Sequence, residues 1–182
     1  MIWLAFIKNR IRKAGYLKYI IRTMQFDIAD PFFLQFLTAM QQRQVRYMLI
    51  GGIAVNFHGV IRNTLDMDIW LAPTNENRDL FYRVLLDLGY TEEEIADYRN
   101  EDFTTFFKCE IGEMPHTIDC LTFVHPNINF DDAEKVMIRH DIGNRLILNV
   151  VDYDFLRNMK ILTHRTKDWY DVSELDKFKK KK

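Results

Sequence analysis

The chain has 182 residues, 48% of them hydrophobic and 14% aromatic, which is enough to build the core of one domain or of one domain with a small extension. No apolar run is long enough to span a bilayer, and the positive charges follow rather than precede the apolar residues 1–7, so neither a membrane span nor a signal peptide is predicted. Two cysteines are too few for a disulfide framework, which predicts a reduced, cytoplasmic setting. The formal net charge of the chain is −1.

Residues 1–29 are predicted to form a basic helical extension. Apolar residues recur at steps of three and four from Leu4 to Met24, which favours a helix with one apolar face. Residues 1–26 carry six positive charges and no acid, and five of the last six residues of the chain are lysines. The preferred interpretation is a helix packed on the domain with a solvated basic face. The alternative is an arm that contacts RNA, a membrane surface or a partner.

Residues 30–182 are predicted to form one domain in which helices and strands alternate. Asp30 followed by Pro31 marks a helix start, and Thr74 and Gly89 mark the start and the end of another helix. This order predicts the α/β (α+β) class, with a small mixed β-sheet flanked by helices. The predicted helices cover residues 31–44, 53–58, 74–88, 91–99, 130–140, 153–163 and 169–178, and the predicted strands cover 45–50, 67–71, 103–111, 116–123 and 145–151, with a hairpin between the third and fourth strands.

Two carboxylates, Asp66 and Asp68, lie two positions apart at the predicted strand 67–71. Because alternate residues of a strand share a face, both carboxylates point the same way, and the apolar residues that alternate with them face the core. Two like charges side by side are unfavourable unless a positive group lies between them. Mg²⁺ prefers oxygen ligands and commonly binds one or two carboxylates together with substrate phosphates. The pair therefore predicts a magnesium site.

A glycine pair, Gly51-Gly52, ends the predicted strand 45–50 and precedes the short helix 53–58. Glycine lets a phosphate approach the backbone closely, and the free N–H groups of a helix start attract anions. A phosphate site beside a carboxylate pair that binds metal predicts chemistry on a nucleoside triphosphate.

The spacing of these residues resembles a known family. Gly-Gly at a strand end, followed by Asp-x-Asp on the next strand, is similar to the nucleotidyltransferase superfamily of DNA polymerase beta. The fuller string resembles a narrower branch, the minimal nucleotidyltransferases and the abortive-infection toxin nucleotidyltransferases of bacterial toxin–antitoxin systems. The resemblance covers the chain from Asp30 to about Leu175 and implies the nucleotidyltransferase fold. The string comprises Gly51-Gly52, Ala54, His58-Gly59, Arg62, Thr64, Asp66 and Asp68.

The resemblance also implies roles for residues outside the acid pair. Asp119, in the apolar context Ile-Asp-Cys-Leu of the predicted strand 116–123, matches the third acid of the superfamily, which binds metal and polarises the attacking hydroxyl. Arg62 and Thr64 lie between the glycine pair and the acids, and a guanidinium suits bidentate contact with a phosphate. The alternative for Asp119 is an edge-strand residue in solvent, and the alternative for Arg62 is a salt bridge within a loop.

A charged pattern near the C-terminus, Lys-x-x-x-x-Arg-x-Lys-Asp-x-x-Asp, begins at Lys160 and resembles the C-terminal helices of the toxin-type enzymes. The resemblance implies that Lys160 reaches the phosphates of the nucleotide, while Asp168 and Asp171 orient Arg165 or Lys167. The alternative is a pair of surface helices with ordinary charge pairs three and four residues apart.

The predicted function is Mg²⁺-dependent transfer of a nucleoside monophosphate from a nucleoside triphosphate to a hydroxyl. The preferred role is a toxin-type enzyme that modifies an RNA end or a protein and is silenced by an antitoxin, with no membrane partner. One alternative is a small-molecule adenylyltransferase of the aminoglycoside-modifying kind. Another is a nucleotide-binding module without catalysis, which the presence of three acids disfavours. The predicted catalytic and metal-binding residues are Asp66, Asp68 and Asp119, and the predicted nucleotide-binding residues are Gly51, Gly52, Arg62, Thr64 and Lys160.

Overall fold

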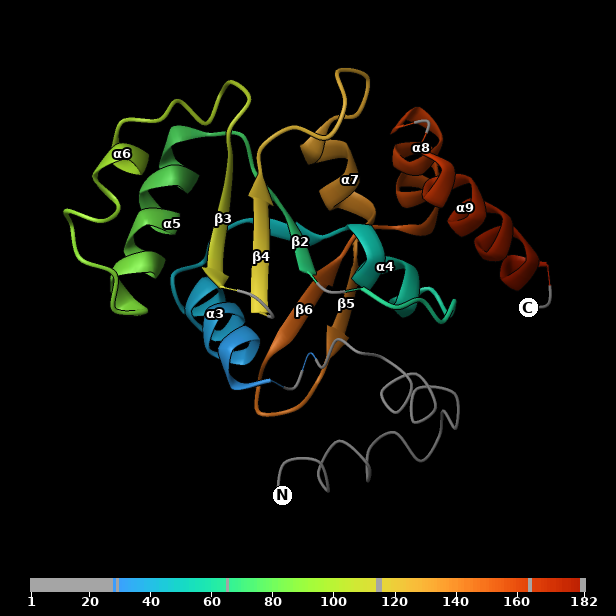
Figure 1. Cartoon of the computed structure of the whole chain (residues 1–182), viewed down its shortest axis with the longest axis horizontal. Helices are drawn as coiled ribbons and strands as arrows, with labels where there is room; N and C mark the ends of the chain where they lie inside the picture. The colour runs from blue at the N-terminus through green and yellow to red at the C-terminus, as the bar shows by residue number, and fades with distance from the viewer. Residues whose placement is uncertain (1–27, 29, 65, 114–115, 164, 181–182) are drawn as a thin grey trace.

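The structure is a computed structural model, and it describes residues 28, 30–64, 66–113, 116–163 and 165–180. Figure 1 shows one mixed β-sheet with helices around it, which confirms the predicted α/β (α+β) class. The predicted extension, residues 1–29, lies outside the described residues except for Ile28, so the extension stays a prediction. Among the described residues, no helix is both long and apolar enough to cross a lipid bilayer.

The helices and strands carry the labels of Figure 1. The helices are α3 (Pro31–Gln42), α4 (Gly51–Phe57), α5 (Asn75–Asp87), α6 (Ala96–Arg99), α7 (Phe130–Val136), α8 (Tyr153–Thr163) and α9 (Thr166–Lys179). The strands are β1 (Tyr47–Leu49), β2 (Asp66–Leu71), β3 (Lys108–Glu113), β4 (His116–Leu121), β5 (Ile138–Asp141) and β6 (Ile147–Val150).

The six strands form a single sheet in the order β3-β4-β2-β1-β6-β5. β2 is parallel to β4 and β1 is parallel to β6, whereas the other neighbouring strands are antiparallel. In the parallel pair β2–β4, Asp68 lies directly opposite Asp119. Because the two strands pair in this register, their acidic residues lie side by side on one face of the sheet.

Helix α3 begins where the sequence predicts, because the Asp30 carboxylate accepts a hydrogen bond from the backbone N–H of Phe32 at 2.9 Å. Its apolar residues recur at steps of three and four, so one face of the helix is buried. That face packs against α5 and the core of the domain. It consists of Phe33, Phe36, Leu37, Ala39 and Met40.

The predicted hairpin is confirmed, because β3 and β4 pair antiparallel. Its first strand begins later than predicted, at Lys108 instead of residue 103. Ahead of the strand, the Asp102 carboxylate accepts a hydrogen bond from the backbone N–H of Thr104 at 3.0 Å, which forms a turn. Phe103 and Phe107 stack with ring centroids 4.5 Å apart. The aromatic residues that favour a strand in the sequence are therefore used to pack the core.

The predicted helix 130–140 is wrong in its second half. Helix α7 ends at Val136, and β5 follows as an edge strand that pairs antiparallel with β6. The turn between β5 and β6 contains Gly143, Asn144 and Arg145, all with positive φ, at 94°, 51° and 64°. The turn brings β6 back alongside β5. The pairing between these two strands therefore overrides the helical pattern of residues 138–140. Elsewhere α4 and α9 begin earlier than predicted, and α6 is shorter.

Candidate active site

Three carboxylates converge on one face of the sheet. Asp66 and Asp68 lie on β2, Asp119 lies on the neighbouring β4, and one oxygen atom from each lies within 4.8 Å of the others. Their strand neighbours Met67 and Ile118 are fully buried. The strand alternation that predicts a shared face for the acids therefore holds in the structure.

The glycine pair at the start of α4 packs directly against this cluster. Gly51 has a φ of +63°, and an ideal Cβ at this position would lie 1.8 Å from the Asp68 Oδ2 atom. An ideal Cβ at Gly52 would lie 2.7 Å from the Thr64 Oγ1 atom, and the backbone N–H of Gly52 donates to Asp68. The structure thus gives these glycines a reason besides the predicted phosphate binding: a side chain at Gly51 would displace Asp68, and one at Gly52 would displace Thr64. A substitution of Gly52 is therefore not a clean test of the predicted phosphate site.

Asp68 is the acid most strongly affected by its surroundings. Burial, together with the charges of Asp66 and Asp119, raises the pKa of Asp68 to about 6. The nearby ammonium of Lys160 and the hydrogen bond from Gly52 act in the opposite direction but do not cancel the effect. A cation bound between crowded carboxylates of this kind stabilises them, because it relieves the repulsion between their negative charges.

This raised pKa predicts how the stability of the metal-free protein depends on pH. The folded protein holds the Asp68 proton more tightly than the unfolded chain, so this stabilisation is complete below pH 4 and is lost as pH rises from about 4 to about 6. We expect the loss to be about 2–3 kcal/mol. Urea unfolding with a chelator present, at pH 3.5 and pH 7, measures it as the difference between wild type and Asp68→Asn. Parallel pH profiles for the two proteins would contradict the prediction.

Thr64 supports the cluster directly. Its hydroxyl donates a hydrogen bond to the Asp66 Oδ1 atom at 2.9 Å, and the residue is only 5% exposed. Thr64 is predicted to bind the nucleotide, and that role stays a prediction. In the structure its hydroxyl fixes the orientation of Asp66.

Arg62 is held in place by two partners. The Asn56 side chain binds its backbone on both sides, accepting from Arg62 N at 2.7 Å and donating to Arg62 O at 3.0 Å. The Arg62 guanidinium forms a salt bridge with Asp171 at 2.9 Å. The salt bridge joins the loop after α4 to α9, so it is not confined to a loop. Contact between Arg62 and a phosphate stays a prediction.

A buried group of charges joins α8 to α9. The Lys160 ammonium lies 2.8 Å from Asp171 and 3.3 Å from Asp168, and all three side chains are at most 5% exposed. The interpretation as surface charge pairs is therefore wrong. Burial favours a raised pKa for Asp168, but hydrogen bonds from Thr163 and Arg165 outweigh it and hold the pKa below its usual value.

The resemblance implies that Asp168 and Asp171 orient Arg165 or Lys167, and this is correct for Asp168 but not for Asp171. Asp168 pairs with Arg165 at 2.6 Å, as implied. Asp171 instead bridges Lys160 and Arg62. Asp171 therefore links two of the predicted nucleotide-binding residues to each other.

Lys108 is a residue of the site that the sequence analysis missed. Its Nζ atom lies 2.9 Å from the Asp119 Oδ2 atom, and hydrogen bonding to Asp119 raises the pKa of Lys108. Lys108 pairs with Leu121 in the β3–β4 register, two positions along the strand from Asp119. The sequence does contain a signal for this placement. The predicted hairpin pairs β3 with β4, and the alternation of side chains along β3 then puts Lys108 on the same face as Asp119.

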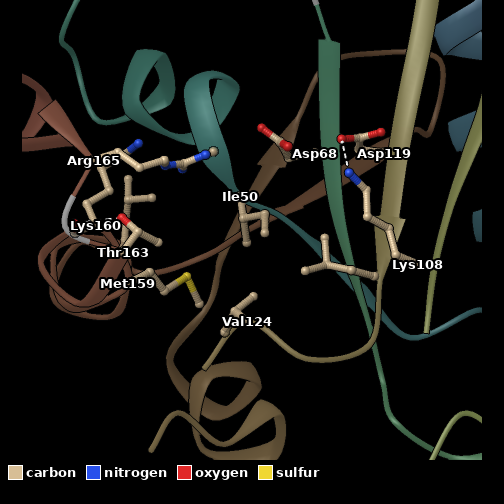
Figure 2. Close-up of a pocket in the computed structure, with 12 residues that line it drawn as sticks. Ile50, Asp68, Lys108, Asp119, Val124, Met159, Lys160, Thr163 and Arg165 are labelled. Atoms are coloured by element: carbon tan, nitrogen blue, oxygen red, sulfur yellow. Dashed lines mark hydrogen bonds and ion pairs between the residues drawn. The ribbon is translucent and has the colours of Figure 1, made fainter. Parts of the chain in front are cut away.

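A pocket of about 420 Å³ lies between the sheet and α8, and its charged lining consists of Asp68, Asp119, Lys108, Lys160 and Arg165. Figure 2 shows Asp68, Asp119 and Lys108 on one side of the pocket and Lys160 and Arg165 on the other. Apolar side chains also line the pocket, and Figure 2 shows two of them, Ile50 and Val124, between the two polar sides. The apolar lining consists of Ile50, Leu121, Val124, Leu156 and Met159.

The donor set of the acid cluster fits a hard divalent cation. Carboxylate oxygens are the ligands that Mg²⁺ prefers, and three of them gather within 4.8 Å. The ammonium of Lys108 already occupies one carboxylate, which shows that a positive group is accommodated at this place. Asp66, Asp68 and Asp119 are thus the residues that could hold the metal.

No family model and no curated protein matches the chain. Among solved structures, the chain is similar to the crystal structure of the lincosamide antibiotic adenylyltransferase LnuA with lincomycin bound. The likeness extends over 82% of this chain and 98% of that chain, with 15% sequence identity and a TM-score of 0.48. A likeness at this level identifies neither a family nor a substrate, so the chemistry must be inferred from the residues of this chain.

Proposed function

We propose that the chain is a Mg²⁺-dependent nucleotidyltransferase that transfers a nucleoside monophosphate from a nucleoside triphosphate to a hydroxyl. The observation that carries the proposal is the arrangement of charges around one pocket. Asp68 and Asp119, two of the three clustered acids that could hold Mg²⁺, lie on one side, and the cations Lys160 and Arg165 lie on the other. A nucleoside triphosphate needs both kinds of group, because its phosphates bind metal and cationic side chains alike.

The residues of the chain divide the chemistry between them. Bound divalent ions supply positive charge to the attacking and leaving oxygen atoms. Asp66 and Asp68 hold those ions, and Asp119 orients the acceptor hydroxyl and takes its proton. The acceptor oxygen forms a bond to the α-phosphorus while the bond from that phosphorus to the β-phosphate oxygen breaks and pyrophosphate leaves. Lys160 and Arg165 lie across the pocket from Asp68 and Asp119, where they would bind the phosphates.

The finer proposal concerns the acceptor and the biological role. Residues 51–68 and the charged pattern near the C-terminus both resemble the toxin-type nucleotidyltransferases. This resemblance supports a toxin-type enzyme that modifies an RNA end or a protein and is silenced by an antitoxin. The apolar side chains between the two polar sides of the pocket favour a second candidate, because they suit an apolar small molecule. That candidate is a small-molecule adenylyltransferase.

A transfer assay with separate acceptors tests the proposal. Purified protein is incubated with each α-labelled nucleoside triphosphate and Mg²⁺, together with total RNA, a protein extract or a panel of small hydroxyl-bearing molecules that includes both aminoglycosides and less polar compounds. We expect label in the RNA or protein fraction, and none when a chelator removes the metal. Label only in the small-molecule fraction would select the second candidate. Absence of transfer to every acceptor, with all four nucleotides, would contradict both.

A further inference from the structure

Lys108 is a cation of the chain itself that sits on the acid cluster. Among the side chains that the structure describes, Lys108 alone forms an ion pair with any of the three acids, through Asp119 at 2.9 Å. The other cation that acts on the cluster, Lys160, is already paired with Asp168 and Asp171. Figure 2 shows Lys108 reaching Asp119 from the side of the pocket away from Lys160 and Arg165.

The charges of this cluster balance a single divalent ion. The three carboxylates contribute −3 and Lys108 contributes +1, which leaves −2. A second divalent ion would share Asp119 with an ammonium group, and like charges on one carboxylate repel each other. The protein in this arrangement therefore accepts one divalent ion more readily than two.

The ion pair between Lys108 and Asp119 can open at a small cost in free energy. Lys108 comes from β3, one of the two edge strands of the sheet, and its side chain is 51% exposed, while that of Asp119 is 20% exposed. Exposed ion pairs contribute little to stability, so Lys108 can leave Asp119 for solvent at small cost. A residue needed only for packing would not combine this exposure with direct contact to the acid.

We infer that Lys108 is a positioning residue that holds Asp119 and competes with divalent cations for it. In the nucleotide-free protein, Asp66 and Asp68 bind one divalent ion while Asp119 stays paired with Lys108. The inference rests on the proposed function, because it takes the acid cluster as the metal site.

Metal binding to the nucleotide-free protein tests the role of Lys108 without any measurement of transfer. Calorimetric titration with Mg²⁺, and titration with Mn²⁺ followed by its electron paramagnetic resonance signal, give affinity and stoichiometry. We expect Lys108→Met to bind divalent ions about tenfold tighter than wild type, or to take up a second ion, because a competing positive charge is removed. Lys108→Arg keeps the charge and should bind as wild type does.

A matched control separates this effect from a general change in charge. Lys135 forms a similar exposed ion pair, with Asp132 at 2.8 Å on α7. Lys135→Met should leave the affinity within about twofold of wild type, since a distant exposed charge is screened. Equal tightening by Lys135→Met and Lys108→Met would overturn the inference.

The remaining outcomes distinguish the inference from the proposed function. If wild type binds the ion, Asp68→Asn loses it and Lys108→Met changes nothing, the metal site stands and the role of Lys108 is overturned. If neither wild type nor Lys108→Met binds Mg²⁺ or Mn²⁺, the metal site itself is wrong and the inference is overturned with it.

Discussion

Replacement of Asp68 by asparagine should reduce nucleotidyl transfer by at least about 10³-fold while the fold persists. Asparagine keeps the shape of the side chain but removes a negative charge from the three acids that lie within 4.8 Å of one another. Metal-bound charge stabilises the transition state by several kcal/mol, and each 1.4 kcal/mol corresponds to about tenfold in rate. Asp66→Asn should have a similar effect. Initial rates of label transfer, with circular dichroism as the check on folding, measure both variants.

Glu110→Gln is the matched control for this loss. Glu110 lies directly opposite Asp119 in the β3–β4 pair and is exposed, but it is not one of the three converging acids. We expect this variant to keep transfer within about threefold of wild type, since a single exposed charge contributes weakly. If Glu110→Gln loses as much activity as Asp68→Asn, the negative field of the sheet matters and the carboxylates do not act as specific ligands. Near-normal transfer by Asp68→Asn would contradict the assignment of the three acids as the catalytic site.

The acid pair could be predicted from the sequence because it depends only on local geometry. A separation of two residues on a strand is enough to set a common face, and the residues that alternate with the acids, Met67 and Ile69, are fully buried as the alternation requires. Asp119 needs more than alternation, because its place beside Asp68 depends on the order and direction of the strands. That information came from the resemblance to a family and not from spacing.

The charged group around Lys160 was only half predictable. The i,i+3 pair of Arg165 and Asp168 follows from helix geometry at the start of α9. The bridge from Asp171 to Arg62 joins residues 109 positions apart, and it depends on how α9 packs beside the loop that follows α4. No local pattern contains that information. Burial also changes what the pattern means, because the same charges on exposed helices would be ordinary surface pairs.

The edge strand β5 shows a different limit. Residues 138–141 carry no decisive period, so a helix continuing from α7 was an acceptable prediction for them. The signal that could have corrected it is the turn that follows, where Gly143 and Asn144 take positive φ. Such a turn directly before the apolar segment 146–151 indicates a hairpin, and β5 and β6 form one.

Replacement of Lys160 by methionine should destabilise the protein by about 3 kcal/mol, because it leaves two buried carboxylates short of a cation. Lys160, Asp168 and Asp171 have side chains at most 5% exposed, so water cannot replace the lost ammonium. Arg165 and Arg62 still pair with the two acids, which keeps the loss at the lower end of the range for buried pairs. Urea unfolding at pH 7 measures the difference.

Lys177→Met is the matched control for stability, since Lys177 pairs with Glu174 at 2.6 Å on the exposed side of α9. Removal of that exposed i,i+3 pair should cost no more than about 0.5 kcal/mol. A loss of less than 1 kcal/mol in Lys160→Met would show that the buried ion pairs contribute no more than surface pairs.

The same variant separates the structural role of Lys160 from its proposed nucleotide role. An ammonium has three N–H donors, and Asp168 and Asp171 engage two of them. Lys160 also lines the pocket opposite the acids, so one donor is left for a phosphate oxygen. We expect folded Lys160→Met, at low temperature, to bind nucleoside triphosphate about 10-fold to 100-fold more weakly with Mg²⁺ present, because a charged hydrogen bond is worth about 1.5–3 kcal/mol. Asp171→Asn breaks the same ion network but keeps the lysine, so it should lower stability with a smaller loss of affinity. Equal losses of affinity in the two variants would assign Lys160 to holding α8 and α9 together, and the phosphates would then have to be held by Arg165.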